Sequence, residues 1–279
     1  MKTIRTTCPY CGVGCGVLAS VDDAGRVSVR GDDQHPANLG RLCVKGAALG
    51  ETTGLAGRLL APEVDGQKVT WPQALAETAS RLQQVIDQHG PQAVAFYASG
   101  QLLTEDYYAA NKLMKGFIGA ANIDTNSRLC MSSAVTGYKR AFGADVVPCS
   151  YEDVENSDLV VLVGSNAAWA HPVLYQRLAQ AKRDNPRLQI VAIDPRRTAT
   201  CEIADRHLAL APGSDGGLFV GLLNALAQAG ACVDGFRDGA QALAEASGWD
   251  VAKVADFCGL AADEVAGFYR DFIAAPRAI

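Results

Sequence analysis

The chain has 279 residues, of which 49% are hydrophobic, and a formal net charge of −5 at pH 7. This length supports two or so domains with real cores. The weak negative charge argues against broad nucleic-acid binding, and no apolar run approaches the roughly 20 residues that a membrane-spanning helix needs. Only seven residues precede the first cysteine. We therefore expect no secretory leader, a cytoplasmic location and reduced cysteines.

The first 45 residues carry a cysteine motif, C-x2-C-x3-C-x27-C-x-K, formed by Cys8, Cys11, Cys15, Cys43 and Lys45. Thiolates are soft ligands that select zinc, copper(I) or iron–sulfur clusters. A close trio of cysteines with a distant fourth is typical of a [4Fe–4S] cluster. Structural zinc more often uses two C-x2-C pairs, and this motif contains one such pair. The spacing therefore favours a [4Fe–4S] cluster, with a zinc site, unliganded cysteines or disulfides as alternatives.

Lys45 lies two residues after the fourth cysteine. Taken alone, a lysine is as often a plain surface residue as a functional one. A cation at this place, however, can bridge a cluster to a second cofactor and stabilise an added electron. The sequence predicts a hairpin over 16–31 and a polar loop over 31–40. We expect residues 1–60 to form a small module that needs its cluster to fold, because its apolar content is thin.

From Trp71 onward the pattern predicts alternating helices and strands. We expect helices over 74–87, 104–119, 132–142, 172–183 and 217–229, and strands over 93–97, 159–163, 189–193 and 207–210. Thr104 is a candidate helix cap, the segment 122–128 is expected to be a loop, and the last segments, around Ala240, Val251 and Glu264, are expected to be helical.

The strand predicted over 159–163 is continuous and apolar, as in a parallel sheet covered on both faces. The fold class is therefore α/β, with a cluster module followed by doubly wound, Rossmann-like domains. We expect an α/β part over 61–131 and a dinucleotide-binding domain over 132–279. The chain stops where a further strand starts, so this domain is expected to be incomplete at its C-terminus.

Ligands of open α/β sheets bind outside the carboxyl ends of the strands. Three such ends carry polar turns, which are Gly164-Ser165-Asn166, Asp194-Pro195-Arg196-Arg197 and Gly213-Ser214-Asp215. Glycine turns offer N–H groups to a phosphate, an aspartate suits a ribose or guanine edge, and arginines suit a pyrophosphate. Each turn alone is an ordinary βα loop, but together they predict a nucleotide site. The G-x-G-x-x-G and GK[ST] motifs are absent, which argues against the usual NAD fingerprint and the P-loop.

Cys130 lies between the loop predicted over 122–128 and the helix predicted over 132–142. A lone cysteine is more often a small buried residue, but a position at the start of a helix favours a thiolate ligand or nucleophile. His35 and His171 are expected to be structural or surface residues and not ligands.

Taken together, these motifs resemble the N-terminal part of the molybdopterin bis-guanine-dinucleotide oxidoreductases, the group that contains nitrate reductases and formate dehydrogenases. The resemblance covers the whole chain in order. It implies that Cys8, Cys11, Cys15 and Cys43 hold a [4Fe–4S] cluster. It also implies that Lys45 relays electrons to a pterin and that Cys130 is the protein ligand to molybdenum. The residues that it implies for two pterin guanine dinucleotides are Lys45, Gln101, Asn126, Gly164, Ser165, Asn166, Asp194, Pro195, Arg196, Gly213, Ser214 and Asp215.

The branch of the family is suggested by Met131, which follows Cys130 where formate dehydrogenases have a histidine. The segments 130–134 and 164–172 resemble assimilatory nitrate reductases. The resemblance thus implies a cytoplasmic enzyme that reduces nitrate to nitrite by oxygen-atom transfer, with ferredoxin, flavodoxin or an NADH-linked reductase subunit as electron donor and no nucleic-acid or membrane partner. A formate dehydrogenase and an electron-transfer module with a cluster alone stay as alternatives. We expect this piece to be inactive by itself.

Overall fold

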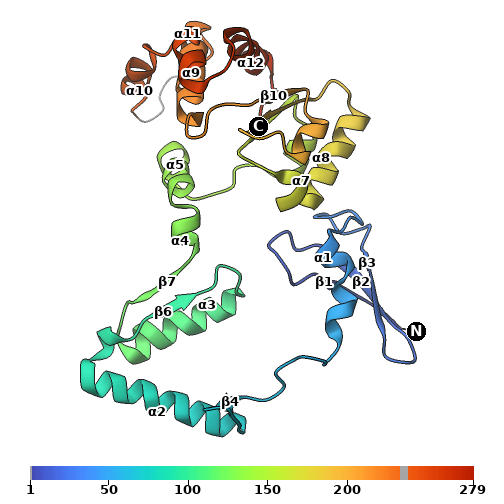
Figure 1. Ribbon diagram of the computed structural model, residues 1–279, viewed down its shortest axis with the longest axis vertical. Coiled ribbons are helices and arrows are strands. Elements are labelled where there is room, and N and C mark those ends of the chain that lie inside the picture. The colour runs from blue at the N-terminus through green and yellow to red at the C-terminus, as the bar shows by residue number, and fades with distance from the viewer. Residues whose placement is uncertain (1, 233–237) are drawn as a thin grey trace. The chain divides into compact units, whose positions relative to one another are not determined.

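The computed structural model describes residues 2–232 and 238–279 (Figure 1). The chain divides into two compact units. The first unit joins Met1–Gly50 to Arg140–Ile279, and the second unit is Glu51–Lys139. The domain boundaries expected at residues 60 and 131 stay predictions, because a compact unit and a functional domain need not end at the same residue.

The first unit begins with a three-stranded antiparallel sheet, coloured blue in Figure 1. Its strands are β1 (Lys2–Thr7), β2 (Gly16–Val21) and β3 (Val27–Gly31). The predicted hairpin is confirmed, and its turn is closed by the Asp22 carboxylate, which accepts hydrogen bonds from the amides of Ala24 and Arg26 at 2.9 Å. The sequence does not predict β1, because all six of its residues are exposed and no alternation marks it. A short helix α1 (Val44–Ala47) and a 3-10 helix (Leu49–Thr53) follow.

The later part of the first unit contains a parallel sheet in the order β10-β9-β8, formed by Arg206–Leu208, Gln189–Ile193 and Leu159–Val163. The end of the chain extends this sheet. Ala278 bridges Leu159 in parallel, and the Ile279 amide donates to the Leu159 carbonyl at 3.0 Å. The bounds predicted for β8 and β9 are confirmed, because both strands are continuous apolar runs at the centre of the sheet. The α/β prediction is confirmed as well.

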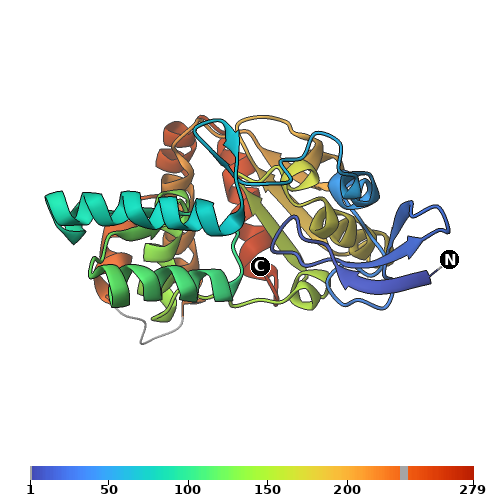
Figure 2. The same cartoon turned by 90° about the horizontal axis from the view of Figure 1, so that it is seen from below.

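Helices surround this sheet and form most of the core. They are α6 (Tyr151–Glu155), α7 (Ala167–Ala170), α8 (Pro172–Asp184), a 3-10 helix (Ala199–Ile203), α9 (Asp215–Gln228), α10 (Gly239–Ala246), α11 (Val251–Cys258) and α12 (Ala262–Ala274). The helices from α9 to α12 are orange to red in Figure 2. Leu208 from the sheet and Val254 and Phe268 from the helices are fully buried in one cluster. The three C-terminal helices expected around 240, 251 and 264 are therefore confirmed.

The second unit contains α2 (Trp71–His89), whose start at Thr70 is a capping box with Gln73. It also contains a hairpin of β4 (Glu63–Val64) and β5 (Gln67–Lys68), a 3-10 turn (Pro91–Ala93), and a parallel pair of β6 (Phe96–Ala98) and β7 (Ile123–Thr125). The remaining elements are α3 (Thr104–Asn111), a π-helix (Lys112–Ile118), α4 (Ser127–Cys130) and α5 (Ser132–Phe142), which runs past the boundary of the unit. Val94, Met114 and Ala120 are its buried core.

The helix predicted over 104–119 has the expected extent, and it changes from α to π geometry at Lys112. Two local expectations for the second unit are wrong. The segment 122–128 is not a plain loop, because Ile123–Thr125 pairs with β6. Thr104 is also not the cap. Leu103 precedes the first turn, and its amide donates to the Asp106 carboxylate at 3.2 Å. Among the described residues, no helix combines the length and the apolar character needed to cross a bilayer.

Candidate functional site

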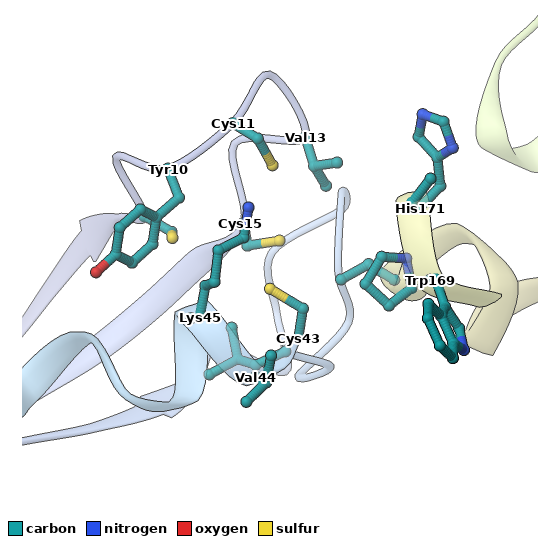
Figure 3. A pocket seen from close by; sticks show the side chains of 15 residues that line it. Tyr10, Cys11, Val13, Cys15, Cys43, Val44, Lys45, Trp169 and His171 are labelled. Atoms are coloured by element: carbon teal, nitrogen blue, oxygen red, sulfur yellow. The ribbon is translucent and has the colours of Figure 1, made fainter. Parts of the chain in front are cut away.

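The four cysteines of the N-terminal motif line one pocket of the first unit (Figure 3). Cys8 follows β1, Cys11 and Cys15 lie in the loop before β2, and Cys43 directly precedes α1. The pocket has a volume of about 130 Å³. The N-terminal segment also contributes Tyr10, Val13, Leu42, Val44, Lys45 and Gly46 to its lining. The opposite wall comes from the corner of α7 and α8, namely Trp169, Ala170, His171, Pro172 and Val173. His171 is exposed and lies on this wall, whereas the sequence marks it only as a surface or structural residue.

The backbone of the cysteine loop is closed by short hydrogen bonds. The Cys8 amide donates to the Cys15 carbonyl at 2.8 Å, and the Gly14 amide donates to the Cys11 carbonyl at 3.2 Å. Gly14 has φ of +62°, a left-handed conformation that suits glycine. The loop between the first three cysteines is thus a defined turn, in which Cys8 and Cys15 are buried and Cys11 is exposed.

The four thiols also interact electrostatically. Burial raises the pKa of the Cys15 thiol, and the nearby sulfurs of Cys11, Cys8 and Cys43 raise that pKa further. A cationic centre among the sulfurs removes this repulsion and favours the thiolates. Cys15 therefore lies in the surroundings that a positively charged metal group would stabilise.

The donor set of the pocket suits an iron–sulfur cubane. A cubane takes one thiolate on each of its four irons, and Cys8, Cys11, Cys15 and Cys43 all line this pocket. Within residues 2–232 and 238–279, no three side chains of His, Cys, Asp or Glu form a site for one metal ion.

Lys45 lies on α1 beside this pocket, and its Nζ is 6.0 Å from the centre of the Tyr10 ring (Figure 3). Tyr10 itself lies between Cys8 and Cys11. The neighbouring Val44 is 82% exposed, so the pocket is bordered by an accessible apolar side chain as well as by a cation.

The three predicted nucleotide-binding turns follow neighbouring strands of the parallel sheet. The Gly164 amide donates to the Ile193 carbonyl at 2.8 Å, which ties the end of β8 to the end of β9. Asn166 accepts a hydrogen bond from the Thr200 hydroxyl at 3.3 Å, and that hydroxyl accepts one from the Ala168 amide at 3.1 Å. The Gly164-Ser165-Asn166 turn is therefore fixed against the segment that follows Asp194.

The Asp194 turn presents cations around a buried carboxylate. Asp194 is 8% exposed and accepts a hydrogen bond from the Arg196 amide at 2.8 Å. Pro195, Arg196 and Arg197 are exposed. The Thr198 hydroxyl is buried without a hydrogen-bond partner in the described structure. Exposed guanidinium groups beside an unpartnered hydroxyl are consistent with a site for phosphate oxygens.

The Gly213 turn starts α9. The buried Ser214 hydroxyl donates to the Ala211 carbonyl at 2.6 Å, and Asp215 is the first residue of the helix. The strand before this turn, β10, pairs with the strand before the Asp194 turn, β9. At their ends the Asp194 amide donates to the Leu208 carbonyl at 3.2 Å. The structure therefore places the three turns after adjoining strands of the sheet.

In the second unit, Asn126 connects two loops that the sequence separates. Its side-chain oxygen accepts a hydrogen bond from the Gly100 amide at 2.9 Å. Its carbonyl accepts one from the Cys130 amide, also at 2.9 Å. Gln101 lies next to Gly100, and its amide donates to the Ser99 hydroxyl at 3.1 Å. Cys130 is exposed and is the last residue of α4, so its thiol is accessible between α4 and α5.

Two further residues support the cysteine pocket and are not marked by the sequence. Asn38 and Arg177 are both buried, at 0% and 2% exposure. The sequence gives no signal for Asn38, because it lies in a polar loop among other polar residues. Arg177 gives one weak signal, because it lies four residues after the apolar Val173 and thus on the same face of its helix.

Comparison with known proteins identifies the family of this chain. Residues 58–232 match the family described as molybdopterin oxidoreductase, and residues 1–53 match the molybdopterin oxidoreductase Fe4S4 domain. The chain is 80% identical over its whole length to a nitrate reductase of Klebsiella oxytoca and covers 32% of that protein.

Two other relatives match over 77% of the chain. A periplasmic nitrate reductase of Desulfovibrio desulfuricans is 44% identical, with 29% of its length covered. An assimilatory nitrate reductase of Haloferax mediterranei is 39% identical, with 30% of its length covered. The chain therefore spans about a third of the length of the curated relatives it matches.

A solved structure supports the fold alone. The acetylene hydratase of Pelobacter acetylenicus superposes with a TM-score of 0.86 at 22% identity, over 98% of this chain and 39% of that protein. The cysteine pocket, the three strand-end turns and the two family matches lead to one conclusion. The chain belongs to the molybdopterin oxidoreductase family.

Proposed function

We propose that this chain is the N-terminal part of the catalytic subunit of an assimilatory nitrate reductase, which reduces nitrate to nitrite by oxygen-atom transfer. The observation that carries the proposal is the 80% identity to the Klebsiella oxytoca nitrate reductase across all 279 residues. The position after Cys130 supports nitrate as the substrate, because Met131 lacks the acid–base group that a histidine would give a formate dehydrogenase.

The cofactors in this proposal are a [4Fe–4S] cluster and a molybdenum bis-molybdopterin guanine dinucleotide. Cys8, Cys11, Cys15 and Cys43 would bind the irons, and the exposed Cys130 would bind molybdenum. When bound, the cluster supplies one-electron transfer and the molybdenum centre supplies the two-electron transfer of an oxygen atom.

The side chains of this chain would hold and tune these groups. Lys45 places a positive charge beside the pocket, which favours the arrival of an electron there. Asn126 fixes the loop of Gln101 to the loop of Cys130. The remaining dinucleotide contacts are assigned to the three strand-end turns, with Gly164, Ser165 and Asn166 at the first, Asp194, Pro195 and Arg196 at the second, and Gly213, Ser214 and Asp215 at the third.

We also propose that the enzyme works in the cytoplasm with ferredoxin, flavodoxin or an NADH-linked reductase subunit as electron donor. The assimilatory relative from Haloferax mediterranei supports this choice. A periplasmic relative exists as well, so the compartment is part of the proposal and not of the family assignment.

The first test concerns the cofactors. Protein purified without oxygen should contain about four irons and matching sulfide per chain, with the brown absorption of an iron–sulfur cluster. Cys43→Ser should lose most of this iron, because it removes one of four thiolates. Cys149→Ser is the matched control, because Cys149 is exposed and lies outside the pocket, and it should keep the iron. Zinc in place of iron would contradict the proposal.

The second test concerns the reaction. The chain should replace the corresponding part of the Klebsiella oxytoca enzyme, and the chimera should form nitrite from nitrate with reduced viologen. Formate oxidation by the same chimera is measured in parallel. A chimera that holds both cofactors but forms no nitrite would refute the nitrate assignment, and formate oxidation would replace it.

A further inference from the structure

One buried amide side chain connects the two halves of the cysteine motif. The side-chain oxygen of Asn38 accepts a hydrogen bond from the Gly16 amide at 2.8 Å. Its NH2 group donates to the carbonyls of Gly16 at 3.1 Å and Arg41 at 2.8 Å. Gly16 directly follows Cys15, and Arg41 lies two residues before Cys43. Asn38 therefore connects the backbone next to the third cysteine to the backbone shortly before the fourth.

The loop that carries Asn38 is held from α8. Arg177 donates through Nη1 to the carbonyls of Pro36 at 2.7 Å and Ala37 at 3.0 Å. Through Nε and Nη2 it forms a fork on the Glu155 carboxylate, at 2.5 and 2.9 Å. Its guanidinium lies 4.9 Å from the centre of the Tyr151 ring. Arginine suits this place because its planar fork can bind a carboxylate and still donate to carbonyls on another side.

Two neighbours on α8 contact the same module. The Gln176 side chain donates to the Leu42 carbonyl at 3.4 Å, one residue before Cys43. Val173 packs in an apolar cluster with Cys8 and Cys15. Val173, Gln176 and Arg177 lie at helical spacing, so one face of α8 contacts both ends of the cysteine motif.

We propose that Arg177 and Asn38 are positioning residues for the iron–sulfur cluster. Arg177 holds the loop of residues 35–42 against α8. Asn38 lies in that loop, and its hydrogen bonds fix the backbone beside Cys15 and the backbone before Cys43. The inference rests on the [4Fe–4S] cluster of the proposed function and deepens it. The Gly164 turn leads through α7 into α8, so the helix that contacts the cysteine module also lies close along the chain to a predicted phosphate-binding turn.

The alternative is that Arg177 only holds the fold together, since loss of one partner from a buried ion pair destabilises the folded state. A purely structural role would change the unfolding temperature and leave the cluster's own properties unchanged at temperatures where the protein is folded. The rate of cluster loss to a chelator and the reduction potential of the cluster distinguish the two roles.

The test uses anaerobically purified protein and the double variant Arg177→Met/Glu155→Gln, which removes both members of the close pair. The more distant partner, Glu152, lies 3.8 Å from Arg177 and is 62% exposed, so water solvates its carboxylate in the variant. The matched control is Arg206→Met/Asp271→Asn, which removes another ion pair of the first unit, with a distance of 2.6 Å. Both are studied well below their unfolding temperatures. We expect the Arg177 variant to lose its visible absorption to the chelator about tenfold faster or more, as for other residues that support metal ligands, and to shift the potential measured by EPR.

The control should keep the parent's rate of cluster loss and the parent's reduction potential, even if its unfolding temperature falls as far as that of the Arg177 variant. Arg177→Lys should give partial rescue, because an ammonium group keeps one cation beside Glu155 but lacks the fork. Asn38→Asp gives a second approach if the Arg177 variant does not fold. It keeps the acceptor for Gly16 and loses both donors, and we expect the same faster loss of the cluster.

The outcomes separate the two proposals. If the parent holds a cluster and the Arg177 and Asn38 variants lose it no faster than the control, the positioning role is wrong and the cluster assignment stands. If the parent holds no iron–sulfur cluster, the proposed function is wrong and the positioning role falls with it.

Discussion

Gly100 and Asn126 are joined by a hydrogen bond of 2.9 Å from the backbone amide of the first to the side-chain oxygen of the second. The bond links the loop after β6, which carries Gln101, to the loop after β7, which leads to Cys130. Since β6 and β7 are parallel neighbours, both loops start at the carboxyl ends of these strands, on the same side of their sheet. The second unit thereby brings together three residues that we propose for the molybdenum cofactor.

This close approach predicts the effect of Gly100→Ala. A Cβ atom at this position would lie 2.8 Å from the Ser127 hydroxyl and 3.0 Å from the Asn126 side-chain oxygen, so the two loops must move apart. We expect the chimera with this variant to keep its iron and to lose molybdenum about tenfold or more, as for other residues that orient metal ligands. Metal analysis measures both. Gly116→Ala is the control, since nothing lies within 4 Å of its added Cβ. An unchanged ratio of molybdenum to iron would contradict the proposed role of this edge.

Lys45 offers an electrostatic prediction. Lys45→Met should keep the iron, because the four thiols are untouched, and should lower the reduction potential of the cluster, because a nearby cation favours the reduced state. EPR-monitored titration measures the potential. Lys253→Met is the matched control. Its ammonium also lies over an aromatic ring, 4.4 Å from Trp249, but on α11 and outside the pocket. Equal potentials for the two variants would exclude the electrostatic role of Lys45.

Asp158 gives a prediction about pH. Hydrogen bonds from Arg277, at 3.0 Å each, hold the pKa of the Asp158 carboxyl below its usual range. The folded chain thus prefers the carboxylate. The resulting stability is present above the unfolded pKa of about 3.9 and disappears as the pH falls through the lower folded value. We expect Asp158→Asn to lower the unfolding temperature at pH 7 and to have less effect at acidic pH.

The control for Asp158 is the same change in an Arg277→Gln background. There the carboxylate has lost its main partner, so Asp158→Asn should have little effect on the unfolding temperature at either pH. A pH-dependent effect that persists without Arg277 would show that another group controls this carboxyl.

Helix packing in the first unit depends on Gly221 of α9. A Cβ atom there would clash with the Tyr269 hydroxyl and with a Val254 methyl group, so the three helices could not keep their spacing. We expect Gly221→Ala to lower the free energy of unfolding by about 1–3 kcal/mol, the usual cost of overpacking. Urea unfolding measures this. Gly216→Ala on the same helix meets open space and should be neutral or stabilising by up to about 1 kcal/mol. Equal stability of the two variants would contradict the packing argument.

The sequence predicts those parts of the fold whose signals are local. Leu159–Val163 and Gln189–Ile193 are strands because their apolar runs are long enough to recognise and are buried. Ile123–Thr125 is missed because three residues with one apolar side chain show no pattern, and the strand exists only through its pairing with β6. β1 is missed for a similar reason, since its side chains are exposed.

The same distinction holds for the candidate site. The cysteines are recognisable because their spacing along the chain is itself the signal. Asn38 and Arg177 are not, because their partners are mainly backbone carbonyls, which any residue type supplies. The bond from Arg177 to Pro36 spans 141 positions, so only the folded chain reveals it.

That long separation also has a consequence for biosynthesis. The cysteine motif emerges from the ribosome well before α8 is synthesised. The nascent motif therefore lacks both Arg177 and the wall of its pocket at the corner of α7 and α8. Iron delivered at that stage would meet an incomplete pocket, from which a cluster would dissociate easily. Stable insertion of the cluster should therefore wait until translation has passed Asp184, which places metal loading late in the production of this segment.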